Sequence, residues 1–200
     1  MVAVLVASAS CGDVARTGRS PSLLVIQSLE AASGADPGTF GGFLLSDVQT
    51  MVEATVGGEN IDVPTIFNDI GQATLRIELK DQGAATSAAA PSVLNQVVLN
   101  RYRIKYVRAD GRNTPGADVP FPIDGGVTAT ITASPVTVGF EMVRHQAKGE
   151  APLRALASFG GRVFISTIAE ITFYGTDLAG NDVQTTGTIS VSFGDYADPD

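Results

Sequence analysis

Few side chains of this 200-residue chain have the type and spacing that chemistry at a site requires. One His and one Cys exclude a zinc site built from several such residues. The histidine, His145, lies in the polar run 144–150, which we interpret as a solvated loop in which Arg144 and Lys148 also face water. No G-x-S-x-G nucleophile elbow and no glycine-rich phosphate loop of the G-x-x-x-x-G-K-[ST] or G-x-G-x-x-G type occurs. We therefore predict no catalytic residue and no cofactor-binding residue.

Oxygen ligands for a metal ion occur near the C-terminus. Asp177, Asn181 and Asp182 offer the hard oxygen atoms that Ca²⁺ prefers. Asp and Asn side chains also form turns by bonding to nearby backbone, which is the alternative interpretation of this run. The three residues are weak calcium candidates, and we expect no other cofactor.

Paired carboxylates could hydrolyse a glycosidic bond, with one acting as the acid and the other as base or nucleophile. The candidates are Glu53, Glu59, Asp62 and Asp69, all in segments rich in turn residues. Nothing in the sequence fixes the separation of any two of them, so a hydrolase is a lesser alternative.

The cysteine, Cys11, follows a short apolar run and the small residues Ala9 and Ser10. This order is typical of a secretory leader and its cleavage site. It resembles the end of a bacterial lipoprotein signal, which implies that Cys11 becomes the lipidated first residue of the mature chain. The alternative is a first strand that buries a free thiol. Residues 1–10 would be the remnant of the leader, and the polar residues 11–22 a tether.

Alternation of apolar and polar residues with a period of two, the strand signal, dominates the rest of the chain. Six segments show it, namely residues 74–80, 101–107, 127–133, 136–142, 169–174 and 188–193. The core should contain the apolar residues Leu75, Ile77, Leu79, Tyr102, Ile104, Tyr106, Ile171, Phe173, Ile189 and Val191.

Other segments complete the expected fold. Residues 23–29 begin apolar on both faces, which suggests a strand covered on both sides. Residues 43–55 fit a helix or strands, residues 91–95 one helical turn, and the proline-rich residues 114–126 a surface connection. We expect helix to be below about a tenth of the chain. The fold class is then all-β, an antiparallel immunoglobulin-like β-sandwich over residues 23–194 as a single domain, followed by a solvated acidic tail, 195–200.

The C-terminal third carries a resemblance to a family. Residues 168–181 end in the turn Asp-Leu-Ala-Gly-Asn, and residues 186–193 return beside them. This pair looks like the final hairpin of a bacterial immunoglobulin-like surface domain, and residues 101–106 resemble the central aromatic strand of such domains. With the Cys11 signal, the chain resembles an uncharacterised bacterial envelope lipoprotein.

Charge and composition narrow the classes of function. The net charge of −8 and the absence of Trp argue against nucleic acid as a partner, and no apolar run reaches the ~20 residues that span a bilayer. We expect a non-enzymatic structural or binding module of the bacterial envelope or cell surface, attached to the membrane by its N-terminal lipid. Its other partners would be envelope proteins or further copies of itself. The alternatives are a subunit of an extracellular filament or surface layer assembled by β-strand addition, and an envelope hydrolase.

Overall fold

The protein, seen in a computed structural model that describes residues 18–196, has an all-β fold with 57% strand and 7% helix. The strands are β1 (Ser22–Ala32), β2 (Phe43–Asp47), β3 (Thr50–Val56), β4 (Glu59–Thr65), β5 (Asp69–Leu79), β6 (Gly83–Ala84), β7 (Ser87–Ala88), β8 (Val97–Val107), β9 (Ile123–Ile131), β10 (Val136–Val143), β11 (Ile165–Asp177) and β12 (Asp182–Gly194). The helical turns are η1 (Val93–Asn95), α2 (His145–Lys148) and η2 (Leu153–Ser158). No helix within residues 18–196 is long and apolar enough to cross a membrane.

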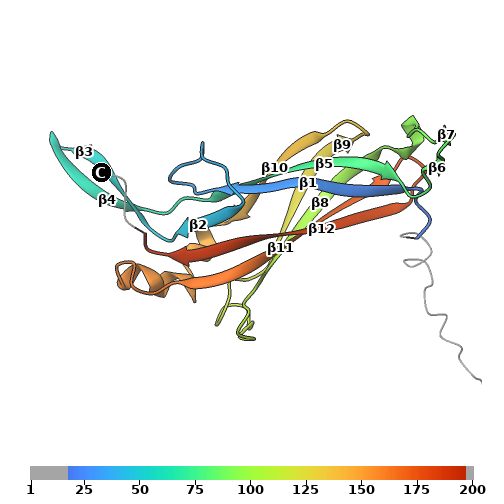
Figure 1. The fold of residues 1–200 in the computed structure, drawn as a ribbon. Coiled ribbons are helices and arrows are strands. Elements are labelled where there is room, and N and C mark those ends of the chain that lie inside the picture. Colours follow the sequence, from blue (N-terminus) through green and yellow to red (C-terminus); the bar gives the residue numbers. More distant parts are fainter. Residues whose placement is uncertain (1–17, 197–200) are drawn as a thin grey trace, which may run out of the picture.

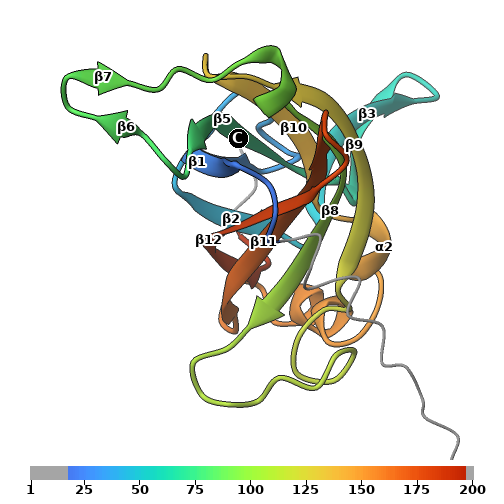
Figure 2. The ribbon, with the colours of Figure 1, turned by 90° about the vertical axis from the view of Figure 1, so that its right-hand side faces the viewer.

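Two sheets pack against each other, which confirms the predicted antiparallel sandwich (Figures 1 and 2). The larger sheet has the strand order β2-β12-β11-β8-β9, and the smaller sheet has the order β1-β5-β10. Pairing within both sheets is antiparallel, with the exception of the parallel pair β2–β12. The hairpins β3–β4 and β6–β7 form separate two-stranded sheets, so their strands do not pair with either sheet of the sandwich.

The core lies between the two sheets, on the apolar faces that the alternation predicted. All but one of the predicted core residues are buried, and the exception, Leu79, is half-buried as the last residue of β5. Phe173 is fully buried and meets Phe140 edge to face, with the ring centroids 5.4 Å apart. Because burying apolar side chains is the main driving force of folding, this interior holds the sandwich together.

Tyr106 shows how the core keeps its polar atoms satisfied. Its hydroxyl donates a hydrogen bond of 2.5 Å to the backbone oxygen of Met142 on the opposite sheet. Burial raises the pKa of Tyr106 well above its ordinary value, and the nearby charge of Asp69 raises it further. The phenol therefore stays neutral and serves as a hydrogen-bond donor that joins the two sheets.

Several segments differ from their predictions. Residues 43–55 form β2 and β3 rather than a helix, and β9 begins at Ile123, inside the predicted surface connection. The expectation that residues 23–29 are covered on both sides is wrong, since Leu23 is 44% exposed. β1 lies at the edge of the three-stranded sheet, and buried and exposed residues alternate at its start.

The run around His145 is also different from its prediction. It forms the one-turn helix α2 instead of a loop, and Lys148 is buried although we expected it to face water. The reason is an ion pair inside the fold, which is described below. At the C-terminal end, Tyr196 is half-buried and its amide donates to Asp47 Oδ1 at 3.1 Å, so the start of the acidic tail is attached to β2.

Candidate interaction site

A two-stranded arm projects from one end of the sandwich. It comprises residues 50–65, in which β3 and β4 pair along their whole length, and Figure 1 shows it reaching beyond both sheets. Gly57 and Gly58 form its tip with φ values of 65° and 91°, left-handed angles that glycine adopts without strain. This tip is one of the glycine-rich turns of the sequence.

One face of the arm is apolar and exposed. The register places Val52 opposite Val63 and Ala54 opposite Ile61, and directly opposed residues share a face of the ribbon. With Val56 nearer the tip, these five residues form what we call the apolar face. Val52, Val63, Ile61 and Val56 are 37%, 36%, 44% and 59% exposed, respectively. A two-stranded hairpin is at best marginally stable alone in water, so a partner that covers this face would stabilise the arm.

The other face of the arm carries acidic and polar side chains toward the tip and the apolar pair Met51 and Pro64 near the base. Glu53 lies opposite Asp62, and Thr55 Oγ1 donates to Asn60 Oδ1 at 2.9 Å. Glu59, at the tip, is paired with Val56 and therefore lies on the same side of the ribbon as the apolar face. Residues 50–65 contain three acidic side chains and no Lys or Arg. Like charges directly opposite each other destabilise a strand pair. The arm therefore suits a partner that is apolar at its centre and basic around it.

A groove with apolar walls crosses the outer face of the larger sheet. One row across four strands contains Phe43, Ser190, Ile168 and Val107, because Phe43 is paired with Ser190, Ser190 with Ile168, and Ile168 with Val107. Phe43 and Ile168 are 52% and 46% exposed, and the small Ser190 between them leaves a hollow. With Ala109 at its end, the groove has a volume of about 280 Å³.

Two cations belong to the elements that form one end of this groove. Lys105 precedes Val107 by two positions on β8 and therefore points to the same outer face. Its ammonium lies 4.0 Å from Glu170, and 60% of its side chain is exposed. Arg112 belongs to the loop after β8, whose residue Ala109 lines the groove, and 65% of its side chain is exposed. We call Lys105 and Arg112 the rim.

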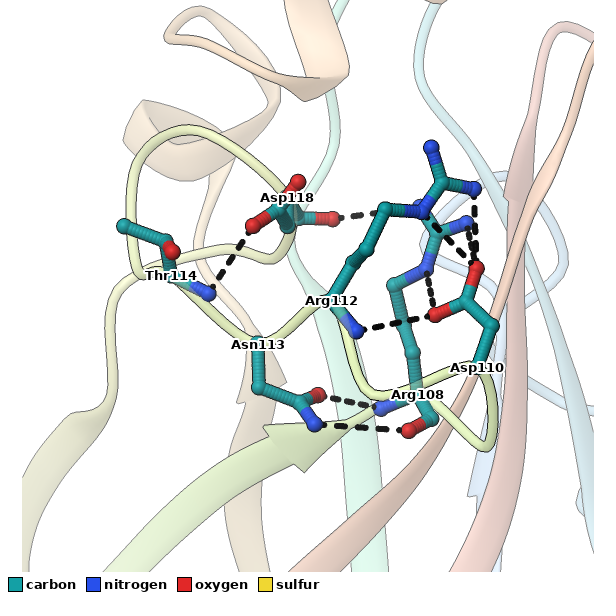
Figure 3. A network of polar contacts seen from close by, with 6 residues as sticks. All are labelled: Arg108, Asp110, Arg112, Asn113, Thr114 and Asp118. Carbon is teal, nitrogen blue, oxygen red and sulfur yellow. Dashed lines mark hydrogen bonds and ion pairs between the residues drawn. The ribbon is translucent and has the colours of Figure 1, made fainter.

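The loop that carries Arg112 is held by a dense polar network (Figure 3). The carboxylate of Asp110 accepts hydrogen bonds from the guanidinium groups of Arg108 and Arg112, at distances from 2.6 to 3.1 Å. These hydrogen bonds lower the pKa of Asp110. Asn113 bonds both backbone groups of Arg108, and Asp118 Oδ2 accepts from the amide of Thr114. The loop therefore presents Arg112 from an ordered position.

The structure brings two of the three calcium candidates together. Both carboxylate oxygens of Asp177 accept hydrogen bonds from the side-chain amide of Asn181, at 3.1 and 2.9 Å, and Oδ1 also accepts from the amides of Ala179 and Asn181. Burial alone would raise the pKa of Asp177, but the hydrogen bonds from Asn181, Ser20 and Ala179 outweigh it and lower the pKa. Asp182 starts the next strand, β12. This geometry is that of a self-bonded turn, the alternative interpretation of the run.

Three of the four carboxylates considered for hydrolysis lie on the exposed arm, and the fourth is buried. Glu53 and Asp62 face each other on the arm, Glu59 lies at its tip, and Asp69 is fully buried at the start of β5. His145 is exposed at the start of α2, where both its amide and its ring Nδ1 lie within hydrogen-bond distance of Asn68 Oδ1.

Asp69 and Lys148 form a buried ion pair that the sequence did not predict. Lys148 Nζ donates to Asp69 Oδ1 at 2.8 Å, where the amide of Gly34 also donates at 2.9 Å. Ser46 Oγ donates to Asp69 Oδ2 at 2.6 Å. Burial raises the pKa of Asp69, whereas Lys148, Ser46 and Gly34 oppose that rise. Because Ser46 lies in β2, directly before the arm, this network fixes the base from which the arm projects.

A second pocket lies near α2. It has a volume of about 390 Å³ and is lined in part by Glu141, Arg144 and Glu150. The carboxylate of Glu141 pairs with Arg144 at 3.3 Å, and Arg144 also donates to the backbone oxygen of Asp124. Two carboxylates thus face one polar pocket, although neither is among the residues that the sequence singled out.

Cys11 lies outside the residues that the structure describes. Within residues 18–196, no group of three or more His, Cys, Asp or Glu side chains could hold a metal ion. The chain matches no protein-family model, and no curated protein and no solved structure is significantly similar to it. The features of this chain that bear on its function are therefore the arm, the groove and the sequence around Cys11.

Proposed function

We propose that this protein is an exported, non-enzymatic structural or binding module of the bacterial cell envelope, anchored by a lipid on Cys11, that binds its partner through the arm. The exposed apolar face of the arm carries the proposal. Val52, Val56 and Ile61 are exposed to solvent, and they lie on a projection outside the core of the sandwich. Exposed apolar patches on folded proteins commonly mark interaction sites.

The position of the arm supports the same function. The described chain enters the sandwich through β1 at one end, and the arm projects from the other end (Figure 1). A lipid attached upstream of β1 would hold the first end near the membrane, so the arm would point away from the bilayer. The buried pair of Asp69 and Lys148 supports the arm at its base through Ser46.

The anchor can be tested by changing Cys11 to Ala. In cells that express the native gene, we expect the wild-type protein to incorporate a labelled fatty acid and to fractionate with membranes, whereas Cys11→Ala should lose the label and leave the membrane fraction. Several acyl chains are needed for stable anchoring, at ~0.8 kcal/mol per buried CH₂. Ser10→Ala, which keeps a small residue before the cysteine, is the matched control and should retain the label. Mass spectrometry that finds an unmodified Cys11 still preceded by Ser10 would contradict the anchor.

An envelope hydrolase is the second candidate, and the pocket that Glu141 and Glu150 line is the observation in its favour. Glu150→Gln separates the two functions. If the protein is a hydrolase of envelope polysaccharide, this change abolishes turnover of isolated envelope glycans. If it is a binding module, neither the wild-type protein nor the variant releases reducing sugars.

A further inference from the structure

We propose that the partner of the arm is a second copy of this chain, whose groove on the larger sheet receives the apolar face of the arm. This inference deepens the proposed function and rests on it only for the role of the arm as a contact surface. Export and lipid attachment are not needed for two copies to associate, so they can fail independently.

The apolar surfaces of the arm and the groove match each other. The groove has the apolar walls Phe43 and Ile168 and the small Ser190 between them, which leaves room for a branched side chain. The arm offers exposed branched side chains of this kind, among them Ile61 and Val63. Docking would remove both apolar surfaces from water at once.

The arm and the rim carry charges of opposite sign. The arm has three acidic side chains and no basic one, in a chain whose net charge is −8. Lys105 is on the same sheet face as the groove, and Arg112 is in the loop whose Ala109 lines it; their side chains are 60% and 65% exposed. Arg112 is paired with Asp110 at 2.8 Å, and its guanidinium retains further donors. Glu170 is 4.0 Å from Lys105, so the ammonium retains donors for a further carboxylate. When the apolar face enters the groove, Glu59 would approach the rim directly, and Glu53 and Asp62 at the back of the arm would lie within its field.

The small size of the arm indicates a weak contact, which a symmetric exchange of arms would double. A strand of seven residues spans roughly 23 Å at about 3.3 Å per residue, so one arm covers much less than the ~1,200 Å² typical of a stable interface. The arm and the groove are different surfaces, so two copies can exchange arms and form both contacts in one closed dimer. We therefore expect reversible association that depends on protein concentration.

Sedimentation velocity of the full chain, with unlipidated Cys11 kept reduced, tests the contact. The wild-type protein should associate as its concentration rises. Ile61→Glu on the arm and Ile168→Glu in the groove should each weaken association at least about tenfold, because a charge would be buried at the contact. Val93→Glu is the matched control, since Val93 is apolar and 66% exposed in the η1 turn, outside the arm and the groove. Circular dichroism should show that all variants are folded.

Charge reversal identifies which surfaces meet. One variant carries Glu53→Lys and Asp62→Lys, and the other carries Lys105→Glu and Arg112→Glu. Each alone should be monomeric, because its arm and its rim then have the same sign. An equimolar mixture should associate again, because each arm finds a rim of opposite sign on the other variant.

Three results would overturn the proposal. The first is a wild-type chain that remains monomeric at every concentration. The second is association that survives Ile168→Glu or reversal of the rim, since the arms would then pack on each other or elsewhere. The third is a mixture of the reversed variants that fails to associate. None of these results bears on fatty-acid labelling of Cys11, so failure here is distinguishable from failure of the anchor.

Discussion

Replacement of Lys148 by methionine should lower the free energy of unfolding by about 3–5 kcal/mol, the usual cost of removing one partner of a buried ion pair. Methionine fills a similar volume but leaves the carboxylate of Asp69 without its cation, in a site where both side chains are almost completely buried. The hydrogen bonds from Ser46 and Gly34 remain, and they satisfy the carboxylate only in part. Urea denaturation followed by circular dichroism measures the loss.

The cost of this substitution should depend on pH in a defined direction. Burial raises the pKa of Asp69 above its ordinary value of 3.8, and removal of Lys148 removes the strongest opposing influence. The folded variant therefore holds a proton that the unfolded chain releases. A group with a raised folded pKa favours the folded state below the unfolded pKa, and that contribution disappears as the pH rises through the folded pKa. The penalty of Lys148→Met should thus be smallest near pH 4 and larger at pH 8.

Two further variants control this result. Lys105→Met removes an exposed lysine whose ammonium lies 4.0 Å from the carboxylate of Glu170. This change should alter the free energy of unfolding by less than about 1 kcal/mol. Asp69→Asn combined with Lys148→Met removes both charges and should recover part of the loss. Equal effects of Lys148→Met and Lys105→Met would show that Lys148 is not buried in a charged pair.

Phe173→Ala should cost about 3–5 kcal/mol, since it removes a fully buried aromatic side chain and leaves a cavity. It also removes the edge-to-face contact with Phe140 across the two sheets. Phe164→Ala is the matched control, because Phe164 is 63% exposed and should contribute less than about 1 kcal/mol. The measurement is again the free energy of unfolding from denaturant titration. A loss at Phe173 no greater than at Phe164 would contradict the assignment of the core face of β11.

The sequence predicts the sandwich well because strand periodicity is local information. Residues 101–107 alternate so regularly that the inward face of β8 can be identified without a structure, and Tyr102, Ile104 and Tyr106 are buried as expected. The ends of elements are less local. Ile123 belongs to β9 because it pairs with Ile104 of β8. The proline-rich run that precedes Ile123 in the sequence does not indicate this pairing.

The candidate site depends on contacts between distant residues, and this is why the sequence predicts little of it. Asp69 and Lys148 are 79 positions apart, so neither reveals that the other neutralises it. The groove is a row across four strands that requires the strand order and the register. The arm is different, since alternating Val52, Ala54 and Val56 before the turn at Gly57 and Gly58 is a hairpin signal that the sequence contains. Only the structure shows that the sandwich leaves this hairpin uncovered.

The most direct test of the central claim, that the apolar face of the arm is the contact surface of this protein, is photocrosslinking in the envelope of living cells. A photoreactive residue at Val56 would lie on the apolar face, and one at the adjacent exposed Thr55 would lie on the acidic face. The proposed function predicts a discrete adduct from Val56 in the envelope fraction and little or none from Thr55, and docking between copies predicts that peptides around Phe43 and Ile168 form the adduct. Equal yields from the two positions, or no adduct from Val56, would contradict the claim.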